Sequence, residues 1–239
     1  KIIGEIKLAE SFEDEIDKLE KRIHQQKETL VKLASALSQK RNELAKKISK
    51  EVKEVLKDLG IPQSIFEVKI AQTIGEQNSP KNGVPFRFNP RGYDEVEFFI
   101  STNLGEDAKP LSKVASGGEV SRIMLALKSI LAKNDKLPLL IFDEIDTGIS
   151  GRISQKVGQA LKNLAAFHQV ISITHQPQIA ALADTHFVVE KNIADDRVVS
   201  SIKKLKNEER IREVAKLLSG EVITETNLQT AKELMGIQK

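Results

Sequence analysis

The stretch Leu139-Leu140-Ile141-Phe142-Asp143-Glu144 places four apolar residues directly before two acids. A short and wholly apolar run of this kind is typical of a strand buried inside a sheet. The two carboxylates then lie at the carboxyl end of the strand, which is the edge where open α/β sheets bind their ligands. An apolar strand that ends in Asp-Glu also occurs as a plain solvated strand end, so the pair by itself leaves a catalytic role open.

Helical and apolar segments alternate on both sides of this strand. The expected elements are helix 119–133, strand 139–142, helix 151–166, strand 170–173, a short helix near 177–183, strand 185–190, strand 197–205 and helices at about 207–218 and 225–235. Short apolar strands between helices predict a mostly parallel sheet that is covered by helices on both faces. The predicted fold class of this part of the chain is therefore α/β.

The N-terminal part of the chain has a different pattern. After Gly4 there is no glycine or proline until Gly60, and apolar residues recur in steps of three and four from Leu8 to Leu44, with interruptions at Gln26 and Lys40. This heptad-like seam predicts one helix of about 80 Å, at about 1.5 Å per residue. An amphipathic helix packed on its own domain is the alternative, but the length favours a projecting coiled coil whose partner strand is not in this sequence. We therefore predict a coiled-coil arm at 1–59 and a head at 60–239.

The segment that follows the predicted helix is expected to form strands. Gly60-Ile61-Pro62 ends the helix, and strand-like runs lie at 65–70, 84–88 and 95–100. The segments between these runs are rich in the turn-forming residues Asn, Gly, Pro and Ser. We expect the three runs to form a small antiparallel meander.

The composition excludes several kinds of site and location. The 239 residues contain no cysteine, which rules out disulfides, thiol catalysis and zinc-cysteine sites. No apolar run approaches the roughly 20 residues of a membrane span, and the start lacks the order of a signal peptide, so a cytoplasmic location is expected. The net charge of +3 neither requires nor excludes a nucleic-acid partner. The first residue is Lys1 rather than Met, which suggests a fragment of a longer chain.

A candidate phosphate-binding loop precedes the acidic strand. Ser116-Gly117-Gly118-Glu119 opens the expected helix 119–133. Small residues and unpaired N–H groups at a helix N-terminus favour an anion such as phosphate. A serine N-cap with glycine in the turn is the plainer alternative. No glycine in the chain is followed by lysine, so the P-loop that usually holds nucleotide phosphates is absent.

The acids and a histidine after the strand suit nucleotide hydrolysis. Asp143 is placed to hold Mg²⁺ through water, because this small ion dehydrates reluctantly, and Glu144 is placed to deprotonate the attacking water. Asp146 lies in the tight loop that follows. Thr174-His175 stands at the end of the next expected strand, where the histidine can reach a terminal phosphate, although a capped loop histidine is the alternative. The remaining histidines are interpreted as structural or solvated: His24, His168 and His186.

These elements occur in the order of the second half of an ATP-binding-cassette ATPase head, namely signature motif, Walker B, D-loop and H-loop. The longer wording resembles bacterial recombination and repair ATPases related to the SMC and Rad50 proteins, in Pro110-Leu-Ser-Lys-Val-Ala-Ser-Gly-Gly-Glu-Val-Ser-Arg122, Phe142-Asp-Glu-Ile-Asp-Thr-Gly-Ile-Ser-Gly151 and Ile173-Thr-His-Gln-Pro-Gln-Ile-Ala-Ala181. The resemblance covers essentially the whole chain. Val120 stands where that family has leucine, which is a mild departure.

The resemblance implies a fold and an activity. The fold would be the C-terminal lobe of an ABC-type ATPase head, with a mostly parallel sheet and flanking helices, a small β meander and a projecting coiled-coil helix. The complete protein would be an ATPase in the recombinational repair of DNA double-strand breaks, whereas this chain alone, lacking Walker A, would be inactive. The head of another SMC or Rad50-type ATPase is the alternative. A transporter ATPase subunit, or a structural coiled-coil protein with coincidental motifs, agrees less well with the motifs and the long helix.

The same resemblance implies cofactors, residue roles and partners. ATP and Mg²⁺ would bind, with Glu144 and His175 as catalytic residues and Asp143 holding the metal ion. Residues that would contact the ATP of a second head, or join the two sites, are Ser116, Gly117, Gly118, Glu119 and Asp146. The implied partners are the N-terminal Walker A half, a second head in an ATP-dependent homodimer, and DNA, with no membrane. The implied location is the bacterial cytoplasm, at the nucleoid.

Overall fold

The computed structural model describes residues 2–72, 87–114, 117–194, 197–220 and 222–237. The chain divides into two compact units, unit 1 with residues 1–49 and 67–99 and unit 2 with residues 50–66 and 100–239. All candidate site residues fall in unit 2. The assignment of residues 1–59 as a coiled-coil arm stays a prediction.

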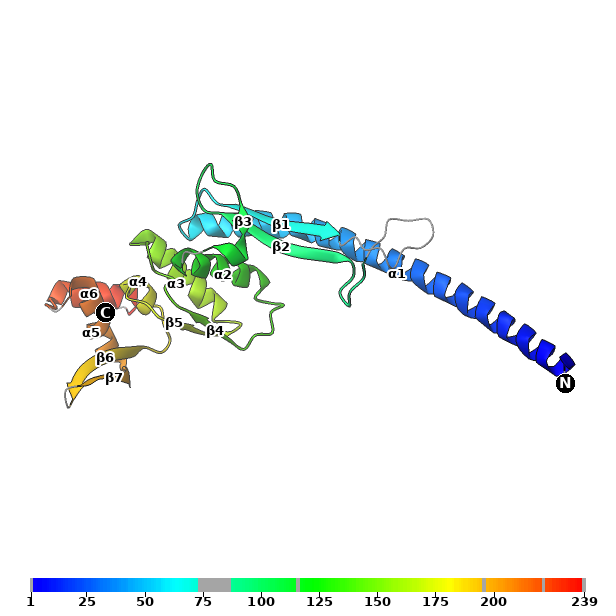
Figure 1. Cartoon of the computed structure of the whole chain (residues 1–239). Coiled ribbons are helices and arrows are strands. Elements are labelled where there is room, and N and C mark those ends of the chain that lie inside the picture. The colour runs from blue at the N-terminus through cyan, green and yellow to red at the C-terminus, as the bar shows by residue number, and fades with distance from the viewer. Residues whose placement is uncertain (1, 73–86, 115–116, 195–196, 221, 238–239) are drawn as a thin grey trace. The chain divides into compact units, whose positions relative to one another are not determined.

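Helix α1 (Ile2–Asp58) is one uninterrupted helix, as the absence of internal proline predicts (Figure 1). It ends in a glycine turn, because Gly60 adopts a φ of 89° and the N–H of Ile61 donates to the carbonyl of Leu56 at 2.9 Å. This is the Schellman arrangement, which satisfies a carbonyl that the helix end would leave unpaired. Neither α1 nor any other described helix is long and apolar enough to cross a membrane.

The apolar seam of α1 is exposed along most of its length. The seam residues with exposed side chains are Phe12, Ile16, Leu19, Ile23, Leu30, Leu33, Leu37 and Leu44. The residues of α1 that are buried in unit 1 are small: Ala34, Ser38 and Ala45. Within unit 1 the helix therefore makes its buried contacts with small side chains and leaves these large seam side chains exposed, whereas Val52 and Leu56 near its end are buried.

A polar cluster holds α1 against the start of β2 (Asp94–Ser101) within unit 1. The Asp94 carboxylate is 1% exposed and accepts from the Ser38 hydroxyl and from the Arg41 guanidinium, each at 2.8 Å. The other arm of Arg41 donates to the carbonyl of Arg91 at 2.7 Å. Because the buried charge is paired and both of its oxygens are used, this cluster fixes the position of the helix along the strand.

Replacement of Asp94 by alanine is expected to lower the free energy of unfolding of unit 1 by about 3 kcal/mol, because Arg41 and Ser38 both lose their partner in a buried setting. Amide hydrogen exchange of unit 1 measures the loss. Asp17→Ala is the matched control, since Asp17 is exposed on the same helix and its replacement should change stability by less than about 0.5 kcal/mol. Equal losses for the two variants would contradict this view of the cluster.

Strand β2 lies between β1 (Ile65–Gln72) and the short β3 (Lys109–Pro110) in a three-stranded sheet. The structure confirms the predicted strands at 65–70 and 95–100. Of the predicted strand 84–88, residues 84–86 lie outside the described part of the chain. Arg87 and Phe88 are described and are not in a strand, and β3 was not predicted.

A parallel pair of strands forms the centre of unit 2. Strand β4 (Leu139–Phe142) pairs with β5 (Gln169–Ser172), and Ile173 extends the pairing by donating to the carbonyl of Phe142 at 3.0 Å. Helices α2 (Gly117–Leu131) and α3 (Arg152–Leu164) precede the two strands and contact each other. All four elements lie within two residues of their predicted bounds. Because the strands are parallel, the residues that follow them meet at one edge of the sheet.

The parallel pair buries only one of its two faces among the described residues. Leu140 and Phe142 are buried, whereas Ile141 is 62% and Ile173 is 57% exposed, and Leu139 and Ile171 are also exposed. The prediction of a sheet covered on both faces is therefore wrong for the described residues. A wholly apolar strand indicates that both faces suit burial, but it does not say that the same segment of chain supplies both covers.

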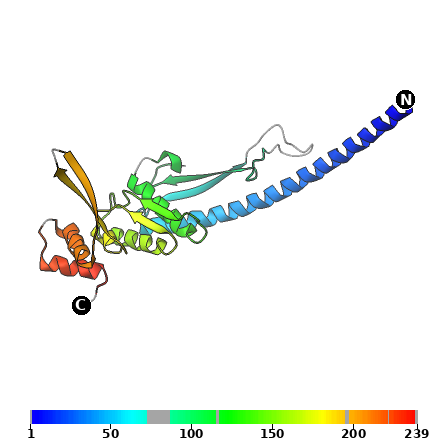
Figure 2. The ribbon, with the colours of Figure 1, turned by 90° about the horizontal axis from the view of Figure 1, so that it is seen from below.

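The predicted strand 185–190 does not join the parallel pair. It is β6 (Phe187–Ala194), which pairs antiparallel with β7 (Arg197–Lys204) in a two-stranded ribbon of their own, with Phe187 opposite Lys204 and Ala194 opposite Arg197 (Figures 1 and 2). An apolar run predicts a strand but not its partner, and strands that are neighbours in sequence pair most readily. The expectation of one mostly parallel sheet is corrected at this strand.

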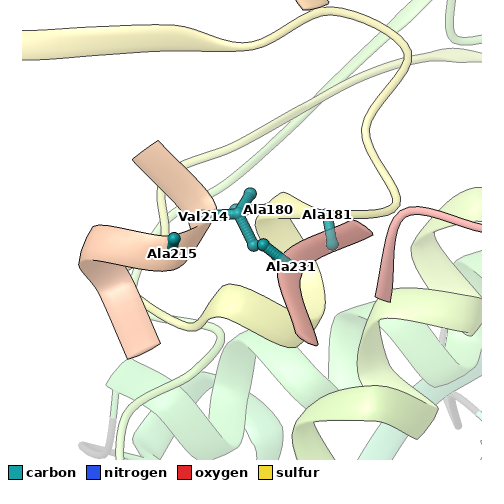
Figure 3. Packing of buried hydrophobic residues seen from close by; sticks show 5 residues of the cluster. All are labelled: Ala180, Ala181, Val214, Ala215 and Ala231. Atoms are coloured by element: carbon teal, nitrogen blue, oxygen red, sulfur yellow. The ribbon is translucent and has the colours of Figure 1, made fainter. Parts of the chain in front are cut away.

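Three helices close unit 2 around a small apolar core. Helices α4 (Pro177–Ala180), α5 (Asn207–Ser219) and α6 (Glu225–Leu234) contact one another. Figure 3 shows the buried residues that they share: Ala180, Ala181, Val214, Ala215 and Ala231. Small side chains let the helices approach closely. The cluster anchors α4, which begins two residues after His175.

Candidate functional site

The residues after β4 form a tight turn, 143–147, which we call the acidic turn. The N–H of Thr147 donates to the carbonyl of Glu144 at 3.0 Å, and the N–H of Glu144 donates to the carboxylate of Asp143 at 2.9 Å. Glu144 has a φ of 56° and is the one described non-glycine residue with a positive φ. Such a conformation costs about 1–3 kcal/mol and persists where the surrounding structure over-determines it.

Asp143 and Glu144 are both accessible to a ligand, and Asp143 suits a metal ion. Both side chains are exposed at the end of β4, so both can reach a ligand. One oxygen of Asp143 accepts from the backbone, and no group of three or more His, Asp or Glu side chains lies together in the described parts of the chain. A single carboxylate of this kind fits Mg²⁺, which keeps several waters and often takes only one or two protein ligands.

The glycine pair that opens α2 lies directly against the acidic turn. A Cβ atom on Gly118 would stand 2.9 Å from both the Cβ and the carbonyl oxygen of Thr147, and one on Gly117 would overlap the Glu144 carboxylate. Close approach therefore requires glycine at Gly118, where backbone atoms stand in the way, whereas at Gly117 the obstruction is the movable Glu144 side chain. Neither glycine has a positive φ. Ser116, which the sequence places in the same loop, lies outside the described residues.

Two side chains of α2 hold the backbone of the acidic turn. The Ser121 hydroxyl donates to the carbonyl of Asp143 at 2.7 Å. The Arg122 guanidinium, 5% exposed, donates to the carbonyl of Thr147 at 2.8 Å and lies 3.4 Å from the carbonyl of Ile145. Neither residue was predicted to have a role. Their spacing after the glycine pair is visible in the sequence, but nothing there indicates that an arginine in this helix is buried.

Asp146 joins the acidic turn to the end of β5. Its carboxylate is buried and accepts from the Thr174 hydroxyl at 2.5 Å and from the N–H of His175 at 2.8 Å. The imidazole Nδ1 of His175 lies 3.1 Å from the same carboxylate, while its side chain is 73% exposed. The structure therefore brings Asp146 and His175 together at one sheet edge and leaves the imidazole accessible.

The remaining candidate residue is Glu119, and the three remaining histidines were interpreted as structural or solvated. Glu119 is half-buried one turn before Arg122; burial lowers the pKa of Arg122, and the nearby charge of Glu119 opposes that effect. His168 is buried with Nδ1 2.7 Å from the carbonyl of Leu137. Burial and the charge of Arg210 lower the pKa of His186. His24 is exposed on α1, 3.5 Å from Glu28. None of these three histidines takes part in the cluster at the end of β4 and β5.

Comparison with known proteins links the chain to DNA repair proteins. It is 40% identical over 225 residues to the DNA repair protein RecN of Halalkalibacterium halodurans, which is 94% of this chain and 38% of that protein. It is 38% identical over 238 residues to RecN of Bacillus subtilis, covering 98% of the chain and 41% of the relative. RecN of Treponema pallidum is 43% identical over 200 residues, 84% of the chain and 34% of the relative. The chain thus spans about two fifths of the length of these relatives. No family model matches it.

Solved structures of SMC heads overlap partly with the chain. An SMC head domain with a coiled coil and joint from Pyrococcus yayanosii has a TM-score of 0.47 and 20% identity, over 75% of this chain and 30% of that one. A structure from work on ATP-driven dimerization and DNA-stimulated activation of SMC ATPases has a TM-score of 0.42 and 20% identity, over 77% of this chain and 99% of that one.

Proposed function

We propose, since this chain corresponds to the C-terminal part of RecN-type proteins, that it forms the second half of an SMC-like ATPase head that acts in the repair of DNA double-strand breaks. The single observation that supports this most is the packing of the Gly117-Gly118 loop against the acidic turn, beside an accessible histidine. Exposed carboxylates, glycine N–H groups and an imidazole at one sheet edge suit phosphoryl transfer, which needs mainly positioning and charge stabilisation.

Each residue of the site has a role in this proposal. Asp143 would hold Mg²⁺ through water, and the ion would neutralise charge on the phosphates. Glu144 would accept the proton of the attacking water, and His175, held by Asp146, would contact the γ-phosphate. Ser116, Gly117, Gly118 and Glu119 would contact the ATP of a second head, and Asp146 would help to join the two sites, so the active form would be an ATP-dependent dimer.

The exposed apolar face of β4 and β5 supports the proposal that another part of the head covers it. Leu139, Ile141, Ile171 and Ile173 present apolar side chains with no cover among the described residues. Apolar surface gathered in this way marks a surface that is buried in the working protein. We propose that the N-terminal half of the same protein, which would carry the P-loop, covers this face and completes the nucleotide site.

The exposed seam of α1 supports the coiled-coil assignment. Large apolar side chains from Phe12 to Leu44 follow a spacing of three and four, interrupted at Gln26 and Lys40, and are exposed in unit 1. A second helix with matching apolar residues would bury them by knobs-into-holes packing. We propose that residues 1–59 are one strand of an antiparallel coiled coil that leads back to the P-loop half.

The isolated chain is expected to show no ATP hydrolysis above background, because no P-loop holds the nucleotide beside Asp143 and Glu144. A steady-state phosphate-release assay on the purified chain measures this. Addition of the P-loop half as a separate polypeptide should bring activity that disappears with Glu144→Gln. Robust, Glu144-dependent turnover by the chain alone would refute the half-site.

The head of another SMC or Rad50-type ATPase remains the second candidate. It shares the same site, and it differs in the length of the complete coil and in a hinge or zinc hook at its tip.

DNA binding, a cytoplasmic location and association with the bacterial nucleoid belong to the proposal as well. DNA-cellulose retention of the complete protein, with and without ATP, tests the first of these.

A further inference from the structure

We propose that Arg122 is a positioning residue. It connects the loop at 117–118, which would face the nucleotide of a second head, to the acidic turn, which would act on the nucleotide of its own head. This inference rests on the proposed function and adds a connection within one chain. The loop at 117–118 would contact the ATP held by a second head, whereas Glu144 would act on the ATP of its own head. Arg122 and Ser121 are the described side chains of α2 that donate to the backbone of the acidic turn.

Arg122 contacts backbone carbonyl groups of the acidic turn. The guanidinium Nη1 donates to the carbonyl of Thr147 and also lies near that of Ile145, so one nitrogen holds two carbonyls of the acidic turn. Its Nε has no partner among the described groups. Ser121, one residue earlier, holds the carbonyl of Asp143. Together the two side chains fix the backbone on either side of Glu144, the residue whose φ is strained.

The burial of Arg122 is not explained by core packing alone. Removing a guanidinium from water is costly, and an apolar side chain of similar size usually stabilises a core as well or better. The Arg122 guanidinium is buried with one of its donors unsatisfied. This guanidinium lies where the acidic turn meets the glycine loop at 117–118. We infer that its role is to hold the acidic turn in position.

These contacts couple the position of the loop at 117–118 to the position of the acidic turn. Gly118 leaves no space for a side chain between the loop and the acidic turn, and Arg122 joins the same two segments one helical turn later. A displacement of the loop by a bound phosphate therefore moves the acidic turn with it, because tightly packed segments transmit strain. Binding at the site of one head thereby sets the position of Glu144 at the other.

The test is the variant Arg122→Lys in the complete protein that carries both halves of the head. Lysine keeps the charge, but its shorter side chain cannot place the ammonium where the Nη1 of Arg122 contacts both carbonyls. We expect kcat to fall by about 10- to 100-fold, since displacements near 1 Å have effects of this size. KM for ATP should change little, since no binding contact is removed. In the background of Glu144→Gln, Arg122→Lys should cause no further loss, because it acts through Glu144.

Arg210→Lys is the matched control. Arg210 also donates to two backbone carbonyls, those of Ala183 and Asp184, and it has an unpartnered Nε, but it lies outside the proposed site. Its replacement should leave kcat unchanged. If Arg122→Lys does not fold, Ser121→Ala tests the same connection from a partly exposed position, with the same expected fall in kcat.

The outcomes separate this inference from the proposed function. A fall in kcat with unchanged KM, absent in Arg210→Lys, supports the inference. Wild-type kcat in Arg122→Lys, or in Ser121→Ala where the lysine variant does not fold, overturns it while the ATPase proposal stands. A complete wild-type protein that hydrolyses no ATP overturns both.

Discussion

Glu144→Gln in the complete protein is expected to stop ATP hydrolysis while ATP still binds and still pairs the heads. Glutamine has the same size and keeps the position beside Gly117, but it cannot accept the proton of the attacking water. Loss of a general base reduces turnover by about 10²- to 10⁴-fold. Phosphate release measures turnover, and light scattering in the presence of ATP measures pairing. Hydrolysis blocked after binding should accumulate the paired form.

Glu208→Gln is the control for this experiment. Glu208 is exposed in the first turn of α5, and its replacement removes the same charge without touching the site. Its turnover should match that of the wild type. If Glu144→Gln hydrolysed ATP at the wild-type rate, Glu144 would not be the base; if it gave only unpaired heads with ATP, the two-head arrangement would be wrong.

Alanine at the glycine pair is expected to separate stability from activity. At Gly118 the obstructing atoms include the backbone oxygen of Thr147, so Gly118→Ala should lower the free energy of unfolding by about 1–3 kcal/mol, the usual cost of overpacking. At Gly117 the obstructing atom is the end of the Glu144 side chain, which can rotate away. Gly117→Ala should therefore unfold almost as the wild type does, yet its turnover should fall about 100-fold as the carboxylate moves.

Urea unfolding and phosphate release on the same preparations of the complete protein measure both effects. Gly105→Ala is the control for backbone strain, because Gly105 has a φ of 84° and no atom within 4 Å of an added Cβ. It should lose about 1 kcal/mol of stability and keep full turnover. Wild-type turnover in both Gly117→Ala and Gly118→Ala would contradict the close packing of the loop on the acidic turn.

Much of the fold follows from the sequence because local patterns set it. A run without proline or glycine predicts α1, and the apolar run 139–142 matches β4 residue for residue. The partner of a strand is not a local property, which is why β6 was expected in the parallel sheet and pairs with β7 instead. The uncovered face of β4 and β5 was missed for the same reason, since apolar strands indicate a need for cover without its source.

The candidate site shows the same limit. The order of the motifs indicates Asp143, Glu144, Asp146 and His175, and the roles of these residues stay predictions. The buried contacts of Arg122 with the acidic turn depend on how α2 packs, which neither periodicity nor motif reveals. The left-handed conformation of Glu144 is likewise invisible in the sequence, because glutamate has no preference for it.

The central claim is that each nucleotide site is built from two heads, with Glu144 from one and the loop at 116–119 from the other. Mixing two inactive full-length variants, Ser116→Arg and Glu144→Gln, tests it most directly by phosphate release. A mixed dimer would contain one site with an intact Glu144 and an intact loop. Random pairing of equal amounts should therefore restore up to about a quarter of the wild-type rate. A mixture that stays as inactive as its components would contradict the claim and place the whole site within one head.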